Sequence, residues 1–223
     1  MDYLLIEHEG HLLVDADGRR YLVDTGAPWS LAAVPLTLGG REFAVQAQDL
    51  MGNTVVSLGE LVGTPIDGLI GTDVLGAFDV EISLRDGRFT FSEELMPMDG
   101  GMHAEAVQGV PLIECEVGGE PLRMFFDTGA PLSYVSEEHV QGTPLLGEVE
   151  DFHPLMGRFT VPTHAVEVHA WGRPMRIRAG RMPMLLEAAL GLADAQGILG
   201  TEVLRHGVLR WSSRQQRTAL VAH

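Results

Sequence analysis

Asp24-Thr25-Gly26-Ala27-Pro28-Trp29-Ser30 occurs again, 103 positions later (127 minus 24), as Asp127-Thr128-Gly129-Ala130-Pro131-Leu132-Ser133. Each copy follows an apolar run, Tyr21-Leu22-Val23 in the first and Met124-Phe125-Phe126 in the second. Such runs predict buried strands that deliver an aspartate into a glycine-containing turn. Two carboxylates at two equivalent strand ends indicate one paired site.

Two further blocks repeat in the same order. Leu50-Met51-Gly52 matches Leu155-Met156-Gly157, and Leu69-Ile70-Gly71-Thr72-Asp73-Val74-Leu75 matches Ile198-Leu199-Gly200-Thr201-Glu202-Val203-Leu204. Ordered internal repeats indicate an architecture built from similar units. We therefore expect two β lobes, residues 1–97 and 105–223, joined by a linker at 98–104, where Pro97 and paired glycines interrupt the strand pattern.

Local patterns predict a mainly β fold with short helices. Asp-Gly turns in 14–18 and 84–89 predict hairpins. The clearest helix is expected over 184–192, and short helices are expected to begin near Thr72 and Thr201, with these threonines as caps and the following acids at the helix starts.

Composition limits the functional classes. The net charge of -16 argues against nucleic acid as a partner, and no apolar run approaches membrane-spanning length. The N-terminus lacks the pattern of a secretory signal, so a cytoplasmic protein is expected. All 15 basic residues are arginine, which excludes lysine Schiff-base chemistry, and the single Cys115, in an alternating strand pattern, is expected to be a structural thiol.

With these motifs, the chain resembles the clan of aspartic proteases that includes pepsins and retroviral proteases. The resemblance covers nearly the whole chain and implies a bilobal fold of two homologous β lobes with short helices. Ala27 and Ala130, directly after the glycines, resemble the retroviral type more than the pepsins. The length is that of two retroviral units fused, so the resemblance implies a single-chain retropepsin-like endopeptidase, a monomer that acts on peptide or protein substrates without a metal or other cofactor.

The expected chemistry follows from two adjacent carboxylates. Asp24 and Asp127 would share one proton, because two close carboxylates do not both ionise readily, and together they would activate a water for attack on a peptide bond. Gly26 and Gly129 would let the backbone approach the carboxylates closely. The resemblance implies that Thr25 and Thr128 interlock the two loops by hydrogen bonds.

Other repeated residues receive supporting roles. Leu50, Met51 and Gly52, and likewise Leu155, Met156 and Gly157, are candidate flap tips that cover substrate; the alternative is an ordinary hairpin with methionine in the core. Ile70, Gly71, Leu199 and Gly200 are expected to support the site from below. Asp73 and Glu202 are expected to be helix-start acids or ion-pair partners rather than catalysts.

Several alternatives stay open at this point. Asp15 and Asp17 resemble part of a calcium loop, but the later ligand positions are absent. The pairs His8 and His11, and His164 and His169, have no third metal ligand at a suitable spacing. Arg173, Arg176, Arg178 and Arg181 indicate a solvated strand face, with contact to an acidic substrate or partner as the alternative. A catalytically silent peptide-binding protein and a domain-swapped oligomer are the alternative functions.

Overall fold

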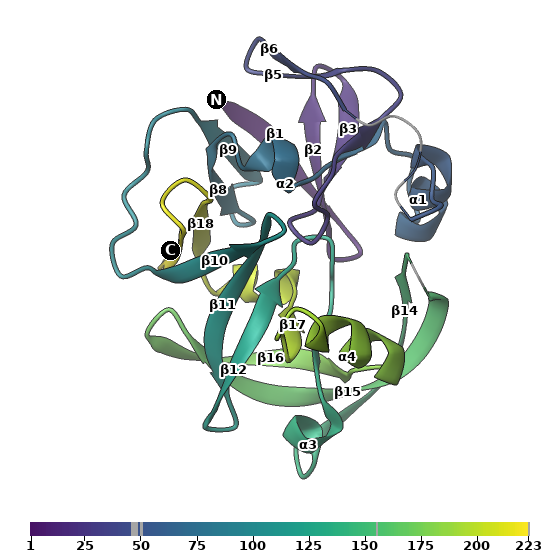
Figure 1. The fold of residues 1–223 in the computed structure, drawn as a ribbon, viewed down its shortest axis with the longest axis vertical. Coiled ribbons are helices and arrows are strands. Elements are labelled where there is room, and N and C mark those ends of the chain that lie inside the picture. The colour runs from purple at the N-terminus through teal and green to yellow at the C-terminus, as the bar shows by residue number, and fades with distance from the viewer. Residues whose placement is uncertain (46–48, 50, 155, 223) are drawn as a thin grey trace.

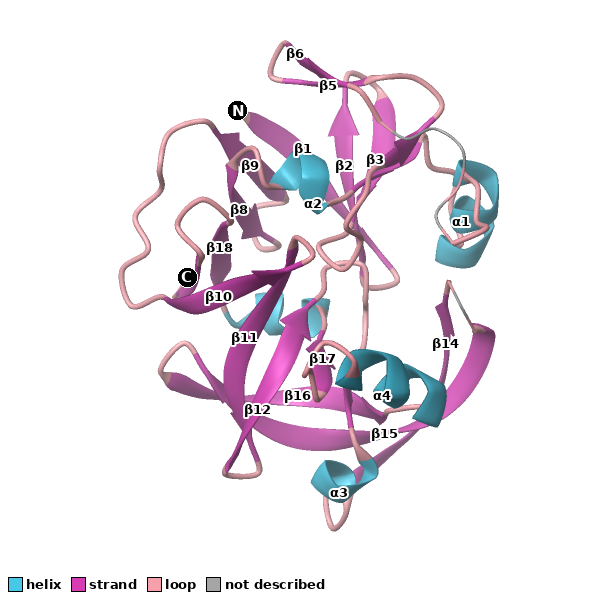
Figure 2. Cartoon of the chain, in the orientation of Figure 1, coloured by secondary structure: helices cyan, strands magenta, loops and turns pink. Residues whose placement is uncertain are grey.

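The computed structural model describes residues 1–45, 49, 51–154 and 156–222. Strands dominate it, which confirms the mainly β prediction (Figure 2). The strands are β1 (Asp2–His8), β2 (His11–Ala16), β3 (Arg19–Val23), β4 (Leu31–Ala32), β5 (Leu36–Leu38), β6 (Arg41–Phe43), β7 (Gly68–Ile70), β8 (Asp79–Ser83), β9 (Arg88–Ser92), β10 (Met102–Val107), β11 (Val110–Val117), β12 (Glu120–Phe126), β13 (Ser133–Val135), β14 (Leu145–His153), β15 (Gly157–Ala170), β16 (Arg173–Arg181), β17 (Gly197–Leu199), β18 (Val208–Ser212) and β19 (Arg217–Val221). The helices are α1 (Val55–Val62), α2 (Thr72–Leu75), α3 (Glu137–Val140), α4 (Met184–Gly191) and the 3-10 helix η1 (Thr201–His206).

Strand pairing gives each half of the chain the same central feature. In the first half, β1, β2 and β3 form antiparallel neighbours, and β3 then pairs in parallel with β7. In the second half, β10, β11 and β12 form antiparallel neighbours, and β12 pairs in parallel with β17. Figure 1 shows the two groups of strands one above the other, with β14, β15 and β16 as long strands of the lower group.

The C-terminal hairpin returns to the first half of the chain. β18 pairs with β8, from Leu209 opposite Ile82 to Ser212 opposite Asp79, and β19 pairs with β10. β10 begins at Met102, inside the range expected to be a linker. The division at 98–104 therefore stays a prediction, and strand pairing continues across it.

The core is continuous beneath both halves. One cluster of buried side chains includes Phe78 and Phe91 from the first half and Phe126 and Trp211 from the second. Two smaller clusters lie apart from it, one containing Leu22, Leu58 and Leu69, and the other containing Tyr134, Leu186 and Ile198. These smaller clusters become the two walls of the site.

Local signals match most of the expected elements. The hairpins β2–β3 and β8–β9 and the helix α4 confirm the predictions for 14–18, 84–89 and 184–192. Short helices do begin at Thr72 and Thr201, but the capping prediction is wrong, because Gly71 and Gly200 occupy the cap positions. The hydroxyl of Thr72 instead donates to the Ala27 carbonyl, and that of Thr201 to the Gly10 carbonyl.

Candidate active site

Asp24 and Asp127 lie at the ends of equivalent strands. β3 ends at Val23 opposite Ile70, and β12 ends at Phe126 opposite Leu199. The backbone N–H of Asp24 donates to the Ile70 carbonyl at 3.0 Å, and that of Asp127 donates to the Leu199 carbonyl at 3.0 Å. The parallel pair in each half thus continues one residue past the strand and positions its aspartate.

Thr25 and Thr128 tie the two loops together reciprocally. Each threonine N–H donates to the hydroxyl of the other at 2.9 Å. The Thr25 hydroxyl donates to the Phe126 carbonyl at 2.8 Å, and the Thr128 hydroxyl donates to the Val23 carbonyl at 2.9 Å. Both side chains are buried, so these four bonds hold the loops in one relative position where water does not compete.

The loops bring the two carboxylates close enough for the charge of one to act on the other. Asp24 Oδ1 also accepts from the N–H groups of Gly26 and Ala27 at 2.8 and 3.0 Å, and Asp127 Oδ1 accepts from Gly129 N–H at 2.8 Å. A Cβ at Gly26 would lie 2.4 Å from Asp127 Oδ2, and one at Gly129 would lie 2.5 Å from Asp24 Cγ. Glycine is therefore required at both positions by close approach across the pair.

Burial and mutual proximity shift the titration of this pair. Burial raises the pKa of Asp24 well above its ordinary value, and the negative charge of Asp127 raises it further. Burial also raises the pKa of Asp127, while a hydrogen bond from Gly129 and the charge of His153 oppose that rise. Two close carboxylates with raised pKa values titrate as a pair, because one proton between them relieves their repulsion.

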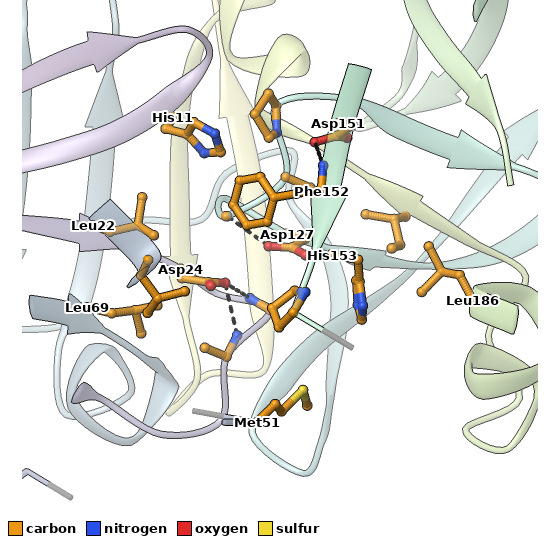
Figure 3. Close-up of a pocket in the computed structure, with 18 of the residues that line it drawn as sticks. His11, Leu22, Asp24, Met51, Leu69, Asp127, Asp151, Phe152, His153 and Leu186 are labelled. Carbon is orange, nitrogen blue, oxygen red and sulfur yellow. Dashed lines mark hydrogen bonds between the residues drawn. The ribbon is translucent and has the colours of Figure 1, made fainter. Parts of the chain in front are cut away.

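The pair lies in a cavity with two different apolar walls. Leu22, Leu58 and Leu69 line the side formed by the first half, and Tyr134, Phe159, Leu186 and Ile198 line the side formed by the second. Figure 3 shows Asp24 and Asp127 between Leu22 and Leu69 on one side and Leu186 on the other. Asp24 and Asp127 are only partly buried, so an extended molecule entering the cavity would reach both.

The second half supplies a hairpin that covers this cavity. β14 pairs with β15 down to His153 opposite Gly157, and Phe152, His153 and Pro154 line the cavity. We call β14, the turn and β15 the lid. Several contacts join the lid to the first half. Phe152 packs on the cluster of Leu22 and Leu58, Asn53 Nδ2 donates to the Pro154 carbonyl at 3.4 Å, and Arg158 Nη2 donates to the Glu60 carbonyl at 3.3 Å.

The two candidate flap tips differ. Met156 and Gly157 lie at the lid turn, and Met156 packs beside the second-half cluster rather than over Asp24 and Asp127. Met51 lines the cavity and Gly52 follows it in a turn, but α1 begins at Val55, and the described residues between β6 and α1 include no strand. The expected hairpin at the first tip is therefore wrong for the described part. Leu50 and Leu155 lie outside the described residues.

The residues expected beneath the site do contact the loops. Gly71 N–H donates to the Ser30 hydroxyl at 2.8 Å, and Gly200 N–H donates to the Ser133 hydroxyl at 3.0 Å. The next residue in each half repeats this pattern: Thr72 N–H donates to the Ala27 carbonyl and Thr201 N–H donates to the Ala130 carbonyl, both at 2.9 Å. Side chains at these two glycines would meet the same carbonyls at 2.7 and 2.5 Å.

Asp73 and Glu202 occupy helix starts but have different partners. Asp73 Oδ1 accepts from the Ser30 hydroxyl at 2.6 Å and from the Ser30 and Val74 N–H groups at 2.9 Å. Glu202 Oε2 accepts from Arg178 N–H at 2.6 Å. Neither acid lines the cavity that holds Asp24 and Asp127.

Sequence reasoning missed four polar or aromatic residues of the cavity: His11, Tyr134, Asp151 and His153. Asp151 and His153 come just before the repeated Leu-Met-Gly block, and that position was the available signal. His11 has no such signal. It is buried, and its ring lies 5.7 Å from that of Phe152.

The remaining predicted features lie away from this cavity. Burial raises the pKa of Cys115 to about 12, as a structural thiol requires. Arg176, Arg178 and Arg181 are exposed, as expected of a solvated strand face, whereas Arg173 is partly buried and donates to the Leu220 carbonyl at 2.9 Å. Among the described residues, no cluster of three or more His, Cys, Asp or Glu is arranged to hold a metal ion. In the same part of the chain, no helix has the length and apolarity needed to cross a membrane.

Comparison with known proteins finds limited similarity. No family model matches the chain. No curated protein matches it. The solution structure of the simian foamy virus (mac) protease aligns with a TM-score of 0.32 and 16% identity, covering 41% of this chain and 90% of that chain. The foamy viral protease-reverse transcriptase in complex with an RNA/DNA hybrid aligns with a TM-score of 0.34 and 16% identity, covering 42% of this chain and 11% of that chain. Similarity this low assigns no function, so the roles of the site residues have to come from the geometry of the site.

Proposed function

We propose that the protein is an aspartic endopeptidase that hydrolyses peptide bonds with a water activated by Asp24 and Asp127. One observation carries the proposal: two carboxylates from equivalent strand ends line one cavity, on loops interlocked by Thr25 and Thr128. An aspartate that only stabilises a turn does not need a second loop bonded to its own in this way. Two adjacent carboxylates with separated titrations are the arrangement that acid–base activation of water requires.

The proposed reaction uses both states of the pair. Asp127 takes a proton from water as the water oxygen bonds to the peptide carbonyl carbon, and Asp24 donates its proton to the carbonyl oxygen. In the resulting tetrahedral intermediate, Asp127 returns its proton to the peptide nitrogen, the C–N bond breaks, and Asp24 regains a proton from one hydroxyl. The products are an acid and an amine, and both aspartates end in their starting states.

We further propose that the two halves are homologous lobes of one active site, as in a single-chain retropepsin-like protease. The matching strand pairs, loop bonds and serine contacts around Asp24 and Asp127 support this duplication. Because one chain contains both aspartates, a monomer suffices for catalysis. An extended peptide or protein segment is the substrate class that fits a cavity with apolar walls on two sides and a lid across it. No cofactor takes part in the proposed chemistry.

A peptide-binding protein without turnover is the second candidate. The lid already contacts the first half through Phe152, Asn53 and Arg158, and the described residues between β6 and α1 of the first half include no strand. A lid that stays closed would retain a bound peptide and exclude a productive water. Peptide binding without cleavage at every pH would favour this second function.

The test is cleavage of a diverse peptide library from acidic to neutral pH, with and without a pepstatin-like inhibitor. We expect cuts within extended peptides and loss of cleavage with the inhibitor, because it competes for the aspartate pair. Cleavage that the inhibitor leaves unchanged would contradict the proposed chemistry. The cut sites also show which substrate residues flank the cleaved bond.

A further inference from the structure

The lid strand β14 presents two neighbouring acids to different surroundings. Glu150 is exposed and forms an ion pair with Arg158 at 3.0 Å. Asp151, the next residue, is partly buried and lines the second-half side of the cavity. Successive side chains of a strand point to opposite faces, so β14 carries one acid outward and one inward.

Asp151 has only neutral hydrogen-bond partners. Its Oδ2 accepts from the Tyr134 hydroxyl, and its Oδ1 accepts from Phe152 N–H at 2.7 Å. No arginine among the described residues forms an ion pair with it. A carboxylate that is removed from water without a cation is costly, and a cationic ligand offsets that cost.

The other titratable groups facing Asp151 do not neutralise it near neutral pH. Burial, together with the charge of Asp151, raises the pKa of Tyr134, so this phenol stays uncharged. Burial lowers the pKa of His153, so the imidazole is mostly neutral there, although Asp127 and Asp151 oppose the shift. Asp24 and Asp127 add negative charge to the same cavity, and His11 is a buried histidine whose pKa is lowered as well.

The walls beside Asp151 suit a long side chain with an apolar stem. Tyr134, Phe159, Leu186 and Ile198 surround this side of the cavity, and the rings of Tyr134 and Phe159 lie 6.3 Å apart. Lysine and arginine pack their methylene groups on apolar surface while the charged head reaches a polar partner. Figure 3 shows Asp151 and Leu186 on the same side of the two aspartates.

We propose that the second-half side of the cavity is a specificity pocket for a basic substrate side chain, lysine or arginine, with Asp151 as its ionic partner. This inference rests on the proposed peptidase function and adds the substrate class. Among the described residues that line the first-half side with Leu22, Leu58 and Leu69, no acid corresponds to Asp151. The enzyme therefore selects a basic residue on one side of the cleaved bond and an apolar residue on the other.

The test compares pairs of peptides that differ only by lysine or the apolar isostere norleucine at one position. With the wild-type enzyme, we expect lysine to raise kcat/KM about tenfold at one position, equivalent to about 1.4 kcal/mol, a modest value for a partly buried charge pair. Asp151→Asn, which retains the acceptor for Tyr134, should bring the lysine-to-norleucine ratio of kcat/KM close to one, and this ratio, rather than the rate on either peptide, is the readout. Glu150→Gln, the matched control on the outer face, should retain the preference.

Equal losses of kcat/KM on both peptides in Asp151→Asn would show that Asp151 only supports the lid. If wild type cleaves peptides without preferring lysine, the basic pocket is rejected and the proposed peptidase function stands. If no peptide is cleaved, the proposed function fails, and fluorescence anisotropy then measures binding of the same peptide pairs. If wild type binds the lysine peptide more tightly and Asp151→Asn abolishes that difference in Kd, the pocket assignment stands for a peptide-binding protein that does not cleave. Equal Kd values for both peptides would reject it.

Discussion

The loop at Asp24 and the loop at Asp127 have matching backbones but different surroundings. Most of their aspartate, threonine and serine hydrogen bonds have a counterpart in the other half, with lengths that agree within 0.2 Å where both halves form the bond, as for Ser30 at 2.8 Å and Ser133 at 3.0 Å. The sixth residue differs: Trp29 is 54% exposed, whereas Leu132 is 5% exposed and belongs to the second-half wall. The repeated bonds serve the paired carboxylates, and the unrepeated contacts give the cavity two chemically different sides.

The coverings of the two halves differ in the same way. The second half extends β14 and β15 over the cavity, and the first half places α1 there instead. The polar residues of the cavity are also distributed unequally: Asp151 and His153 come from the lid, whereas His11 comes from β2. A symmetric pair inside asymmetric walls binds a peptide in one direction, because only one orientation matches both walls.

The largest effect is expected from Gly26→Ala and Gly129→Ala, which test whether the two loops are equally tight. Each new Cβ would lie 2.4 to 2.6 Å from carboxylate atoms of the opposite aspartate. We expect a loss of about 10³-fold or more in kcat/KM for both, since displaced catalytic groups lose acid–base catalysis. Steady-state kinetics with a library-derived peptide measures it. A variant with near wild-type rates would show that its loop can move aside and that the two are not equivalent.

Asp79 tests a contact that the second half does not repeat. It is fully buried and accepts hydrogen bonds from Ser212, Met96 N–H, Arg214 and Gln215. Burial alone would raise the pKa of Asp79, but these donors together lower it. Asp79→Asn should cost about 3 kcal/mol in the free energy of unfolding, because it leaves Arg214 without its charge partner.

The pH dependence of that cost follows from the lowered pKa. The contribution of Asp79 is fully present above the ordinary carboxyl pKa, near pH 4, and is lost as pH falls through the lower folded pKa. Urea unfolding of wild type and Asp79→Asn from neutral to acidic pH should show a constant gap that narrows below about pH 4. A gap independent of pH would contradict the assignment of an ionised Asp79.

Thr25→Val and Thr128→Val sharpen the claim that the interlock is reciprocal. Each removes a hydroxyl that donates to one buried carbonyl and accepts from one buried N–H. We expect each to lower the free energy of unfolding by about 2 kcal/mol, with the two values equal within about 0.5 kcal/mol. Clearly unequal losses in chemical denaturation would mean that one loop carries more of the interlock than the other.

Ser30→Ala and Ser133→Ala should give unequal effects. Both lose the acceptor for a glycine N–H, but only Ser30 also donates to a carboxylate, that of Asp73. Ser30→Ala should therefore be more destabilising, by about 1 kcal/mol, because hydrogen bonds to charged groups exceed neutral ones. Thermal unfolding of the two variants side by side measures the difference, and a larger loss for Ser133→Ala would reverse the comparison.

The smallest effect is expected from the double variant Ala27→Ser with Ala130→Ser. A serine hydroxyl that donates to the ionised pair favours ionisation, whereas alanine cannot donate, so the variant should move the acidic limb of the kcat/KM profile down by about half a pH unit. A pH–rate series with one peptide measures this shift. An unchanged acidic limb would mean that residues 27 and 130 do not tune the aspartate pair.

The sequence was most informative where local pattern and repetition agreed. Apolar runs followed by Asp-Thr-Gly predicted strand ends with aspartates, and the structure places both at one cavity. The helix over 184–192 and the Asp-Gly hairpins were predictable because their signals are local. The catalytic roles themselves stay predictions until activity is measured.

The asymmetry was hard to predict because it depends on context around matching blocks. Leu-Met-Gly occurs in both halves, but Thr54 and Ser57 form a capping box that starts α1 directly after the first block. Helix formation there takes the place of the hairpin that β14 and β15 form around the second block. Asp151 and His11 reach the cavity only through long-range pairing and packing, which a single sequence does not reveal.

The most direct test of the paired-aspartate mechanism is cleavage of one selected peptide by wild type, Asp24→Asn and Asp127→Asn, with unfolding curves for all three. We predict that each variant loses at least about 10³-fold in kcat/KM. Each should unfold at or above the wild-type temperature, because asparagine keeps an acceptor for the loop N–H groups and removes the repulsion between two close carboxylates. Wild-type turnover in either folded variant would contradict the mechanism.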